Sequence, residues 1–530
     1  MTTDWRRAMT LDALKRKGRR VVRMAGRQIA LFDTPKGVLA CNNRCPHEGY
    51  PLREGSLDGS CVLTCNWHNW KFDLATGANF YGGDRLRTYP VELRDGEIWI
   101  DVADEPFEAR RAEIMGNLRD AFDEHDYTRL AREIARLRLL GADPVDAVAE
   151  AIGWSYERFE FGMTHAYAGA ADWLALYDEF AGDPECQLVG LVETVGHIAY
   201  DLHQQRRATS YRYADGVADY DEDRFVAAIE DEDEDTAVAM MRGALDGGLG
   251  FADVERGFAR AALAHYNDFG HSLIYVVKVG RLIDRLGRRV AAPLLFSLVR
   301  SLVYATREDQ IPEFRGYATA LERFGRKANG VAPSAEAFRG LNVKHALALT
   351  ADHGSAPAAA LYRALLGANA RNMATFDLAY QNHVDGQIAD NIGWLDFTHA
   401  ITFANALRLE CAKFPELWPA GLLQMACFSG RNAAFTDPDI ALEDWRVTDV
   451  DAFFDASVEG LFDHGRDEYI VSIHFVKTLL AARAEVRSGA AGEAARDVVA
   501  ALNRLLNSPL KRKHARRTVH QAMAFVALDG

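Results

Sequence analysis

The sequence Cys45-Pro46-His47-Glu48-Gly49-Tyr50-Pro51-Leu52 is followed by Cys65-Asn66-Trp67-His68-Asn69-Trp70, with seventeen residues between His47 and Cys65. Each stretch pairs one thiol with one imidazole. Thiolate and imidazole are common ligands of iron and zinc in proteins. The pattern therefore predicts a metal centre built from two loops. A structural zinc knuckle uses the same residue types and is the simplest alternative.

Both stretches resemble the cluster loops of the Rieske family, in which two cysteines bind one iron of a 2Fe-2S cluster and two histidines bind the other. Leu74-Ala75-Thr76-Gly77 and Tyr89-Pro90-Val91 then follow in the family's order. The resemblance covers about residues 1–103 and implies a centre that carries one electron at a time. Its neutral imidazole ligands raise the reduction potential above that of an all-cysteine cluster. The ligands it implies are Cys45, His47, Cys65 and His68.

Two positions in these loops distinguish branches of the family. The respiratory-complex branch has an extra cysteine in each loop, and the two form a disulfide. Here the corresponding places hold Tyr50 and Trp67. The sequence is therefore similar to the soluble ferredoxin and oxygenase branch. Cys41 and Cys61 lie outside both loops, and we expect them to be buried apolar thiols.

The residue pattern changes after Val102, which predicts two domains. Alternating apolar residues predict a hairpin over 21–32 and further strands near 38–40, 62–64 and 98–102. From about residue 104 to 530, apolar residues recur at three- and four-residue spacing, as in 251–265 and 473–486. We therefore predict a small all-β Rieske domain over 1–103 and a large all-α domain over 104–530, the latter a candidate oxidase or oxygenase domain.

Composition limits the possible partners and compartment. The formal net charge of −15 argues against nucleic acid or an anionic membrane as the main partner. The longest apolar stretch, Val290 to Val299, is too short to cross a bilayer. Seven cysteines, two of them expected at the cluster, and no secretory signal favour a reducing cytoplasm.

Six histidines in the helical part each precede an apolar helical run. They are His165, His197, His271, His345, His399 and His474. Asp268 and Asp396 each lie three residues before a histidine, and Glu193 lies four before His197, so each carboxylate shares a helix face with an imidazole. Carboxylate–histidine pairs of this kind bind iron in helical di-iron proteins. The tentative second metal site therefore comprises His197, His271, His399, Asp268, Asp396 and Glu193.

A local explanation competes with this second metal site. Asp268 and Asp396 are good N-cap residues, which would leave the following histidines in the first turn of a helix. Such histidines can pack in the core or line a pocket without any metal. The sequence leaves these alternatives open.

The helical part is also similar to the questin oxidase-like family. Gly270-His271-Ser272-Leu273-Ile274-Tyr275 is the best match, the segment from Thr164 to Tyr177 is a second, and the likeness covers about residues 120–490. The family is associated with Baeyer–Villiger-type oxidative opening of polyketide quinone rings. The resemblance implies an aromatic or quinone-like substrate and a reaction that can proceed without metal. His271, His399 and His165 would then be the catalytic bases or hydrogen-bond donors.

We therefore expect an oxidoreductase, a monooxygenase, in which the cluster relays electrons to an oxygen-using helical domain that acts on a small aromatic substrate. The chain has no convincing dinucleotide fingerprint, so a separate NAD(P)H-dependent reductase or ferredoxin would supply the electrons. A second possibility is a Rieske ring-hydroxylating oxygenase α-subunit, with mononuclear iron near Glu193, His197, Asp201 and His203. A third is an electron carrier or redox sensor fused to a helical interaction scaffold.

Overall fold

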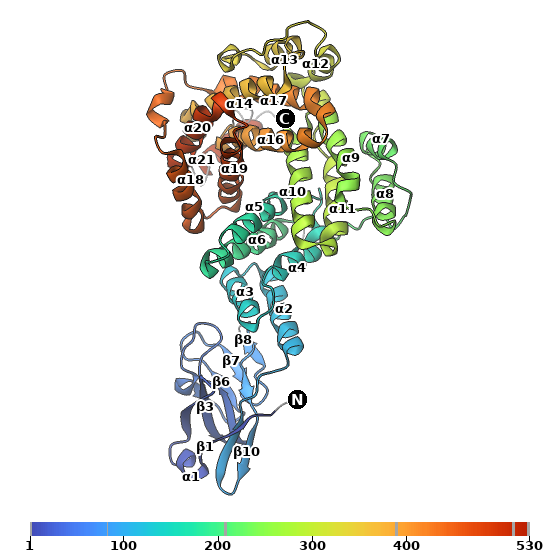
Figure 1. The fold of residues 1–530 in the computed structure, drawn as a ribbon. Coiled ribbons are helices and arrows are strands. Elements are labelled where there is room, and N and C mark those ends of the chain that lie inside the picture. Colours follow the sequence, from blue (N-terminus) through green and yellow to red (C-terminus); the bar gives the residue numbers. More distant parts are fainter. Residues whose placement is uncertain (1–2, 82, 206–208, 387–390, 511–514, 527–530) are drawn as a thin grey trace. The chain divides into compact units, whose positions relative to one another are not determined.

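The computed structural model describes residues 3–81, 83–205, 209–386, 391–510 and 515–526. The chain divides into two compact units, residues 1–144 and 145–530, which we call unit 1 and unit 2 (Figure 1). Unit 1 contains the strands and two long helices, and unit 2 is helical. The predicted fold class, a small β domain followed by a large all-α region, is confirmed.

Unit 1 contains three small antiparallel sheets. Their strand orders are β1-β11-β10, β2-β3-β4-β9 and β5-β6-β7-β8. The strands are β1 (Trp5–Thr10), β2 (Arg19–Met24), β3 (Arg27–Thr34), β4 (Gly37–Asn42), β5 (Ser56–Leu57), β6 (Val62–Thr64), β7 (Lys71–Asp73), β8 (Asn79–Tyr81), β9 (Thr88–Tyr89), β10 (Val91–Arg94) and β11 (Glu97–Asp101), and a short helix, α1 (Leu11–Lys15), follows β1.

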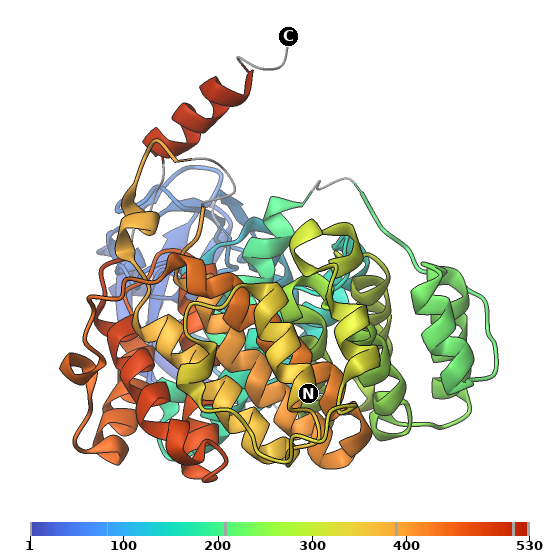
Figure 2. The same cartoon turned by 90° about the horizontal axis from the view of Figure 1, so that it is seen from above.

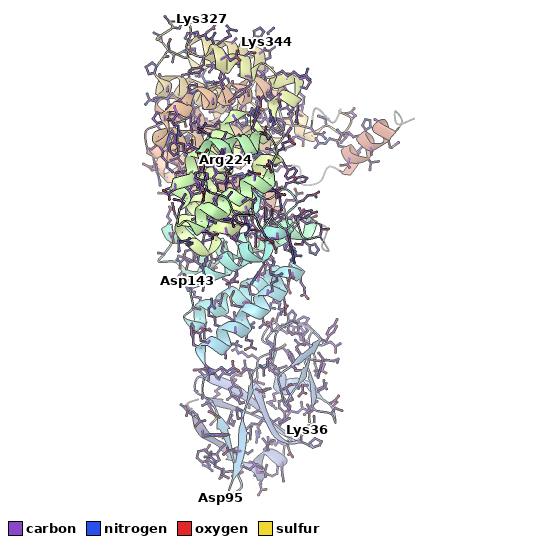
Figure 3. The ribbon with its side chains drawn as sticks, turned by 90° about the vertical axis from the view of Figure 1, so that its right-hand side faces the viewer. Lys36, Asp95, Asp143, Arg224, Lys327 and Lys344 are labelled. Carbon is purple, nitrogen blue, oxygen red and sulfur yellow. The ribbon has the colours of Figure 1, made fainter. Side chains whose placement is uncertain are left out.

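Short turns set the register of these sheets. Ala25 and Gly26 join β2 to β3 with φ of 47° and 74°, the left-handed pair that a two-residue hairpin turn requires. Lys36, in the turn between β3 and β4, and Asp95, in the turn between β10 and β11, project from hairpin ends (Figure 3). Alternate residues such as Ile29 and Leu31 point into the core and are fully buried. The predicted hairpin and strands are thus present.

Two helices, α2 (Phe107–Glu124) and α3 (Tyr127–Leu140), complete unit 1. A buried carboxylate, Asp84, connects α3 to the β domain. It accepts a hydrogen bond from Arg129 Nε at 2.8 Å and another from an Arg136 terminal nitrogen at 2.9 Å, while Arg132 Nε lies 3.5 Å away. The strands end near the predicted boundary of residue 103, but the compact unit extends to Pro144.

Unit 2 is built from helices, which Figure 2 shows from above. Among its described residues, the β structure is a single isolated bridge between Phe376 and Thr436. A ring-hydroxylating α-subunit, the second possibility raised by the sequence, would wrap a helix-grip sheet around its iron site, and the described part of unit 2 contains no such sheet. The helices are α4 (Asp146–Ser155), α5 (His165–Glu179), α6 (Pro184–Gln204), α7 (Glu222–Glu230), α8 (Glu234–Asp246), α9 (Phe251–Ala264), α10 (His271–Leu286), α11 (Ala291–Val303), α12 (Tyr317–Arg323), α13 (Val343–Asp352), α14 (Ala358–Ala374), α15 (Leu378–Asn382), α16 (Trp394–Lys413), α17 (Trp418–Asn432), α18 (Val450–Glu459), α19 (Tyr469–Arg487), α20 (Ala495–Asn507) and α21 (Ala515–Val526).

Four of these helices form the centre of unit 2. Helix α10 packs against both α5 and α16, and α19 packs against the same two helices. Their contacting faces are rich in small and apolar residues, and Gly169 on α5 is one example, because a Cβ there would overlap the side chain of Ile473. The close approach of α5 and α19 therefore depends on this glycine.

One run in unit 2, Arg288–Gln310, is long and apolar enough to cross a membrane by length and composition. It is longer than the Val290–Val299 stretch recognised in the sequence. In the structure 61% of its window is buried, and α11 within it packs against α8 and α10. Because core helices of folded domains pass the same test, this single run is weak support for a membrane span.

Candidate metal centres

The first cluster loop joins β4 to β5 and forms a tight turn around its cysteine. The backbone N–H of Cys45 donates to the carbonyl of Tyr50 at 2.9 Å, and the N–H of Gly49 donates to the carbonyl of Cys45 at 2.8 Å. Gly49 has φ of 77°, a left-handed conformation that favours glycine. The sequence Cys-Pro-His-Glu-Gly-Tyr therefore folds locally into a ligand-bearing turn.

The second loop, between β6 and β7, repeats this geometry. The N–H of Cys65 donates to the carbonyl of Trp70 at 2.8 Å, and the N–H of Asn69 donates to the carbonyl of Cys65 at 2.9 Å. Asn69 takes the place of Gly49 with φ of 63°, which asparagine tolerates better than most residues. Two matching turns thus present one cysteine and one histidine each.

The two histidines of these loops meet. Their Nδ1 atoms lie 3.1 Å apart, between His47 and His68. Trp70 stacks on the His47 ring with centroids 4.6 Å apart, and Trp67 stacks on the His68 ring at 5.0 Å. These contacts hold both rings with the same nitrogen directed toward one point, which suits two ligands of one metal ion. The Nε2 atoms lie 3.8–3.9 Å from the carboxylate of Glu48.

The two thiols are deeply buried behind the loops. Burial, together with the proximity of Cys65, raises the pKa of the Cys45 thiol to about 12, while the backbone N–H groups of His47 and Glu48 act in the opposite direction. A thiol pair in such surroundings ionises readily when a metal cation balances its charge. Two buried thiols and two converging Nδ1 atoms fit the ligand set of a Rieske cluster, with sulfur on one iron and imidazole on the other.

Four histidines of unit 2 also converge, one from each central helix. They are His165 on α5, His271 on α10, His399 on α16 and His474 on α19. His165 and His271 face each other with 3.1 Å between their Nε2 atoms, and His399 and His474 do so at 2.9 Å. The ring centroids of His271 and His399 are 4.2 Å apart, so the two pairs are adjacent. We call this group the four-histidine cluster.

Local sequence features place two of these rings at helix starts. The Thr164 hydroxyl accepts the N–H of Tyr167 and caps α5, so His165 is its first residue. Gly270 precedes α10 with φ of 83°, and a Cβ there would lie 2.7 Å from the ring of Phe428. Glycine at this position therefore allows His271 to begin α10.

A backbone hydrogen bond orients His474. Its Nδ1 donates to the carbonyl of Ile470 at 2.6 Å, one turn earlier in α19. In the neutral ring its Nε2 therefore presents a lone pair to His399 Nε2 at 2.9 Å. A proton on His399 Nε2 or a cation beside the pair satisfies this lone pair. One ring nitrogen each from His165, His399 and His474 lies within 4.8 Å of the others, a spacing that suits ligands of one metal ion.

Burial keeps these rings neutral. It lowers the pKa of His165, His399 and His474 well below the ordinary histidine value, and the nearby Lys477 adds to the effect. Lys477 is fully buried, and its Nζ has no hydrogen-bond partner among the described residues. Burial, followed by the charge of Lys278, lowers the pKa of Lys477 to about 7. Neutral imidazoles are the form that binds metal ions.

Two predicted histidines lie away from this cluster. His197 is in the middle of α6 rather than at a helix start, and its Nε2 lies 3.4 Å from Asp201. Glu193, one turn earlier, pairs with His464 Nε2 at 3.1 Å. His345 is in the first turn of α13 and exposed. Neither His197 nor Glu193 is among the residues that contribute to the four-histidine cluster.

The predicted carboxylate ligands also differ. The Asp396 carboxylate accepts the backbone N–H of Gly393 at 2.9 Å in a capping box of α16, while His399 is one turn further on. Capping, the competing local explanation, therefore accounts for Asp396, although at the third helical position rather than at the N-cap. The side chain of Asp268 lies outside the described residues. The cluster thus differs from a carboxylate-rich di-iron site in its described residues.

Three charged residues near the cluster were not recognised in the sequence. Lys278 on α10 donates to Asp172 on α5 at 2.5 Å, and both are buried. Lys477 lies three residues after His474 on α19. The sequence signal for Lys477 was its place within the apolar run Ile473–Leu480. Lysine is almost never fully buried without a partner, so a lysine in a core helix indicates a special role.

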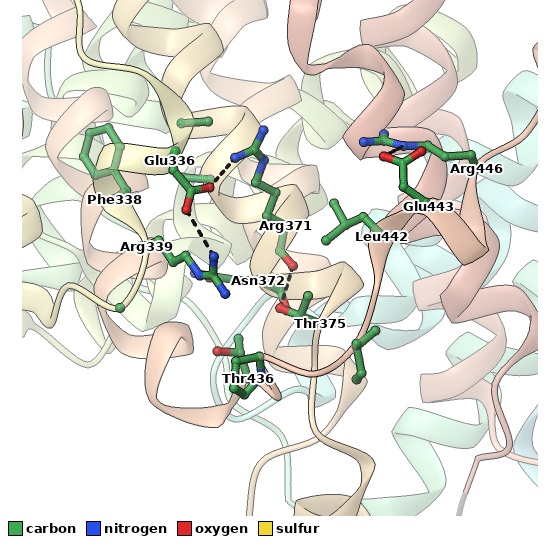
Figure 4. A pocket seen from close by; sticks show the side chains of 15 residues that line it. Glu336, Phe338, Arg339, Arg371, Asn372, Thr375, Thr436, Leu442, Glu443 and Arg446 are labelled. Carbon is green, nitrogen blue, oxygen red and sulfur yellow. Dashed lines mark hydrogen bonds and ion pairs between the residues drawn. The ribbon is translucent and has the colours of Figure 1, made fainter.

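A separate cavity lies elsewhere in unit 2. It has a volume of about 560 Å³ and is lined by residues of α14 and of the loop over 436–446 (Figure 4). Glu336 bridges Arg339 and Arg371 at its wall, with distances of 3.2 and 2.7 Å. None of the four clustered histidines lines it, so it is a separate feature from the four-histidine cluster.

The paired loops define unit 1 as an iron–sulfur domain, and comparisons agree. The sequence profile of the Rieske [2Fe-2S] domain matches residues 4–90. The 3-phenylpropionate/cinnamic acid dioxygenase ferredoxin subunit of Photorhabdus laumondii is 37% identical over 79 residues, which cover 14% of this chain and 75% of the subunit. The chain therefore belongs to the Rieske [2Fe-2S] family through its N-terminal domain, and it carries a Rieske 2Fe-2S cluster.

Two further matches concern the same part of the chain. The 4beta-methylsterol monooxygenase of Methylococcus capsulatus is 39% identical over 95 residues, which are 16% of this chain and 26% of the enzyme. The chain thus spans about a quarter of that relative. The solved ferredoxin of carbazole 1,9a-dioxygenase from Nocardioides aromaticivorans IC177 is 27% identical, covers 19% of this chain and 98% of the ferredoxin, and gives a TM-score of 0.18. The family profile ends at residue 90, so the resemblance of the helical part to the questin oxidase-like family stays a prediction.

Proposed function

We propose that this Rieske-dependent oxidoreductase couples its 2Fe-2S cluster to a non-heme iron held by the four-histidine cluster, where dioxygen oxidises an aromatic or quinone-like substrate. A separate NAD(P)H-dependent reductase or ferredoxin would supply the electrons. Relatives of unit 1 belong to oxygenase systems, among them a dioxygenase ferredoxin subunit and a sterol monooxygenase. These relatives support a redox role in oxygen chemistry, and the geometry of unit 2 supports a second centre.

One observation carries the second centre. One ring nitrogen each from His165, His399 and His474 lies within 4.8 Å of the others, and His474 Nε2 faces His399 Nε2 at 2.9 Å. Burial lowers the pKa of all three rings, so they stay neutral, which is the form that binds a metal ion. His271 offers a fourth imidazole nitrogen, 3.1 Å from His165 Nε2.

Iron is the metal that links this site to unit 1. Imidazole ligands accept iron, copper, nickel or zinc, but iron can take electrons one at a time from a Rieske cluster and react with dioxygen. The four imidazoles are neutral ligands, so they leave the positive charge of the ion uncompensated. A site of that charge favours an anionic oxygen, such as the phenolate of a hydroxylated aromatic ring.

The residues of unit 2 would have distinct roles at such a site. The backbone carbonyl of Ile470 orients His474. The ion pair of Lys278 with Asp172 neutralises a buried charge near the cluster. Because the pKa of Lys477 is lowered to about 7, its amine loses its proton near neutral pH, which reduces repulsion of a metal cation. Tyr275, whose ring centroid is 5.7 Å from that of His271, would contact a ligand bound there.

Metal analysis and oxygen uptake together test this function. A Rieske cluster alone accounts for about two irons per chain, and a mononuclear site raises the content to about three. The purified protein, reduced without oxygen by dithionite, should show the electron-spin signal of a reduced Rieske cluster and then consume oxygen when hydroxylated quinones are added. Two irons per chain and no substrate-dependent oxygen uptake across a broad aromatic panel would contradict the proposal.

A metal-free oxidation is the second candidate. Its support is the lowered pKa of His165 and His399, which leaves both rings available as bases at neutral pH, with His271 beside them. Substrate-dependent oxygen uptake by protein with two irons per chain would favour this candidate. A redox sensor fused to a scaffold predicts no uptake at all, and a scaffold has no need of four imidazoles in contact.

A further inference from the structure

A cavity of about 550 Å³ lies within unit 1, between the β domain and the α2–α3 helices. Its volume falls in the range of small-molecule sites, about 300–1,000 Å³. It is separate from the cluster loops, none of whose residues lines it, and from unit 2, because every residue that lines it precedes residue 141. The lining residues are Arg27, Arg87, Asp104, Glu105, Phe107, Arg110, Ile114, Arg136, Leu139 and Leu140.

The residues that line this cavity have a net positive charge, whereas the whole chain is acidic. Four guanidinium groups and two carboxylates line it, whereas the whole protein has a net charge of −15. Among the described residues, the polar contacts of Arg87, Arg110 and Arg136 each use a single terminal nitrogen. A guanidinium has five N–H donors, so each of these arginines retains donors for another acceptor.

Local contacts hold the arginines in place. Arg27 donates to the carbonyl of Val102 at 2.9 Å and pairs with Asp104. Arg87 donates to the carbonyl of Ala103 at 3.0 Å. Strands and the chain segment after β11 therefore pre-arrange two guanidinium groups on one wall, and such pre-arrangement lowers the entropic cost of binding an anion.

Four apolar residues also line the cavity. Leu139 near the end of α3 is 89% exposed, and Phe107 at the start of α2 is 44% exposed. The buried Ile114 and the half-buried Leu140 complete this apolar group. A group of exposed apolar side chains beside a basic wall matches a ligand with an acidic head and an apolar body.

We propose that this cavity binds a small carboxylate with an apolar body, such as an aromatic or medium-chain acid. The carboxylate contacts Arg87 and Arg110, because planar guanidinium groups recognise carboxylates through paired hydrogen bonds. The apolar body lies against Phe107 and Leu139. The site is independent of the oxidation proposed for unit 2.

Calorimetric titration of the full-length protein with its cluster tests this site, with benzoate and octanoate as probes and benzamide as the uncharged control. We expect both acids to bind and benzamide to bind at least tenfold more weakly. The double variant Arg87→Gln/Arg110→Gln should weaken the binding of both acids at least tenfold. Arg94→Gln, which removes one positive charge from the exposed β10–β11 hairpin, away from the cavity, should leave binding unchanged.

A second variant keeps the test decisive if the double variant unfolds. Leu139→Glu changes a side chain that is 89% exposed, so it should not disturb folding, yet its negative charge should repel the acids. Three results would overturn the proposal: no heat of binding with either acid, equal binding of benzamide, or acid binding that Leu139→Glu leaves unchanged. Equal affinity for inorganic phosphate would show a simple anion site and overturn the role of the apolar wall.

Discussion

His399 and His474 present their Nε2 atoms to each other at 2.9 Å, although 75 residues separate them in the chain. The contact exists because α16 and α19 pack together and because His474 Nδ1 donates to the carbonyl of Ile470, four positions earlier. The same bond that orients the His474 ring leaves its Nε2 lone pair in the cluster. Helix packing and ring orientation together thus bring the two Nε2 atoms face to face.

The first prediction concerns this pair. Replacing His474 with alanine removes one imidazole from the cluster, so we expect the iron content to fall from about three to about two per chain. Substrate-dependent oxygen uptake should fall to background, while the electron-spin signal of the reduced Rieske cluster remains. His345→Ala, at an exposed histidine of α13, serves as the matched control and should change neither value. Unchanged iron content in His474→Ala would contradict the proposal that the four-histidine cluster binds iron.

The second prediction concerns Asp84, which holds α3 against the β domain. Its side chain is 1% exposed and that of Arg129 is 4% exposed, so the pair is shielded from water. Asp84→Asn leaves buried guanidinium charge without its carboxylate, and we expect the free energy of unfolding of unit 1 to fall by about 3 kcal/mol. Denaturation followed through the visible absorbance of the cluster measures this loss.

An exposed ion pair provides the control for Asp84. Asp123 pairs with Arg119 at 2.7 Å along α2, with both side chains more than a third exposed. Asp123→Asn should lower stability by less than about 1 kcal/mol, since solvent screens such pairs. If both variants lose the same small amount, Asp84 is no more than a surface contact, and α3 is held to the β domain by other contacts.

The Rieske site could be predicted from the sequence because its geometry is local. Each cysteine and histidine pair lies within one short turn, and Gly49 marks the left-handed residue that closes the first turn. The two turns lie on adjacent strands of a small domain, so few arrangements bring them together. The ligand types and spacing therefore identified the cluster before any coordinates.

The four-histidine cluster could be predicted only in part. Sequence pattern singled out all four histidines among six, but the predicted second metal site included His197, which contributes no ligand to the cluster, and left out His474, which does. Which histidines meet depends on how α5, α10, α16 and α19 pack, and residue periodicity does not specify those long-range contacts. Asp396 shows a second reason, because a carboxylate near a helix start can serve capping as well as metal binding.

The last prediction concerns a buried acidic pair between α16 and α9. Glu410 is 1% exposed, and one of its carboxyl oxygens has no hydrogen-bond partner among the described residues. Glu255 lies beside it and pairs with Lys413 at 2.5 Å. Burial, followed by the negative charge of Glu255, raises the pKa of Glu410 from 4.5 to about 8.

The folded protein therefore holds a proton on Glu410 between pH 4.5 and about 8, whereas the unfolded chain releases it. Since the folded state binds more protons in this window, its stability falls as the pH rises, by at most about 1.4 kcal/mol per pH unit. Glu410→Gln cannot ionise, so its free energy of unfolding should depend less on pH and exceed that of the unsubstituted protein at pH 8. Denaturation at pH 6, 7 and 8 measures both slopes, and Glu459→Gln, at the exposed end of α18, should leave the slope unchanged. Parallel slopes for Glu410→Gln and the unsubstituted protein would show that Glu410 is already ionised in the folded state, with Lys413 rather than a proton balancing its charge.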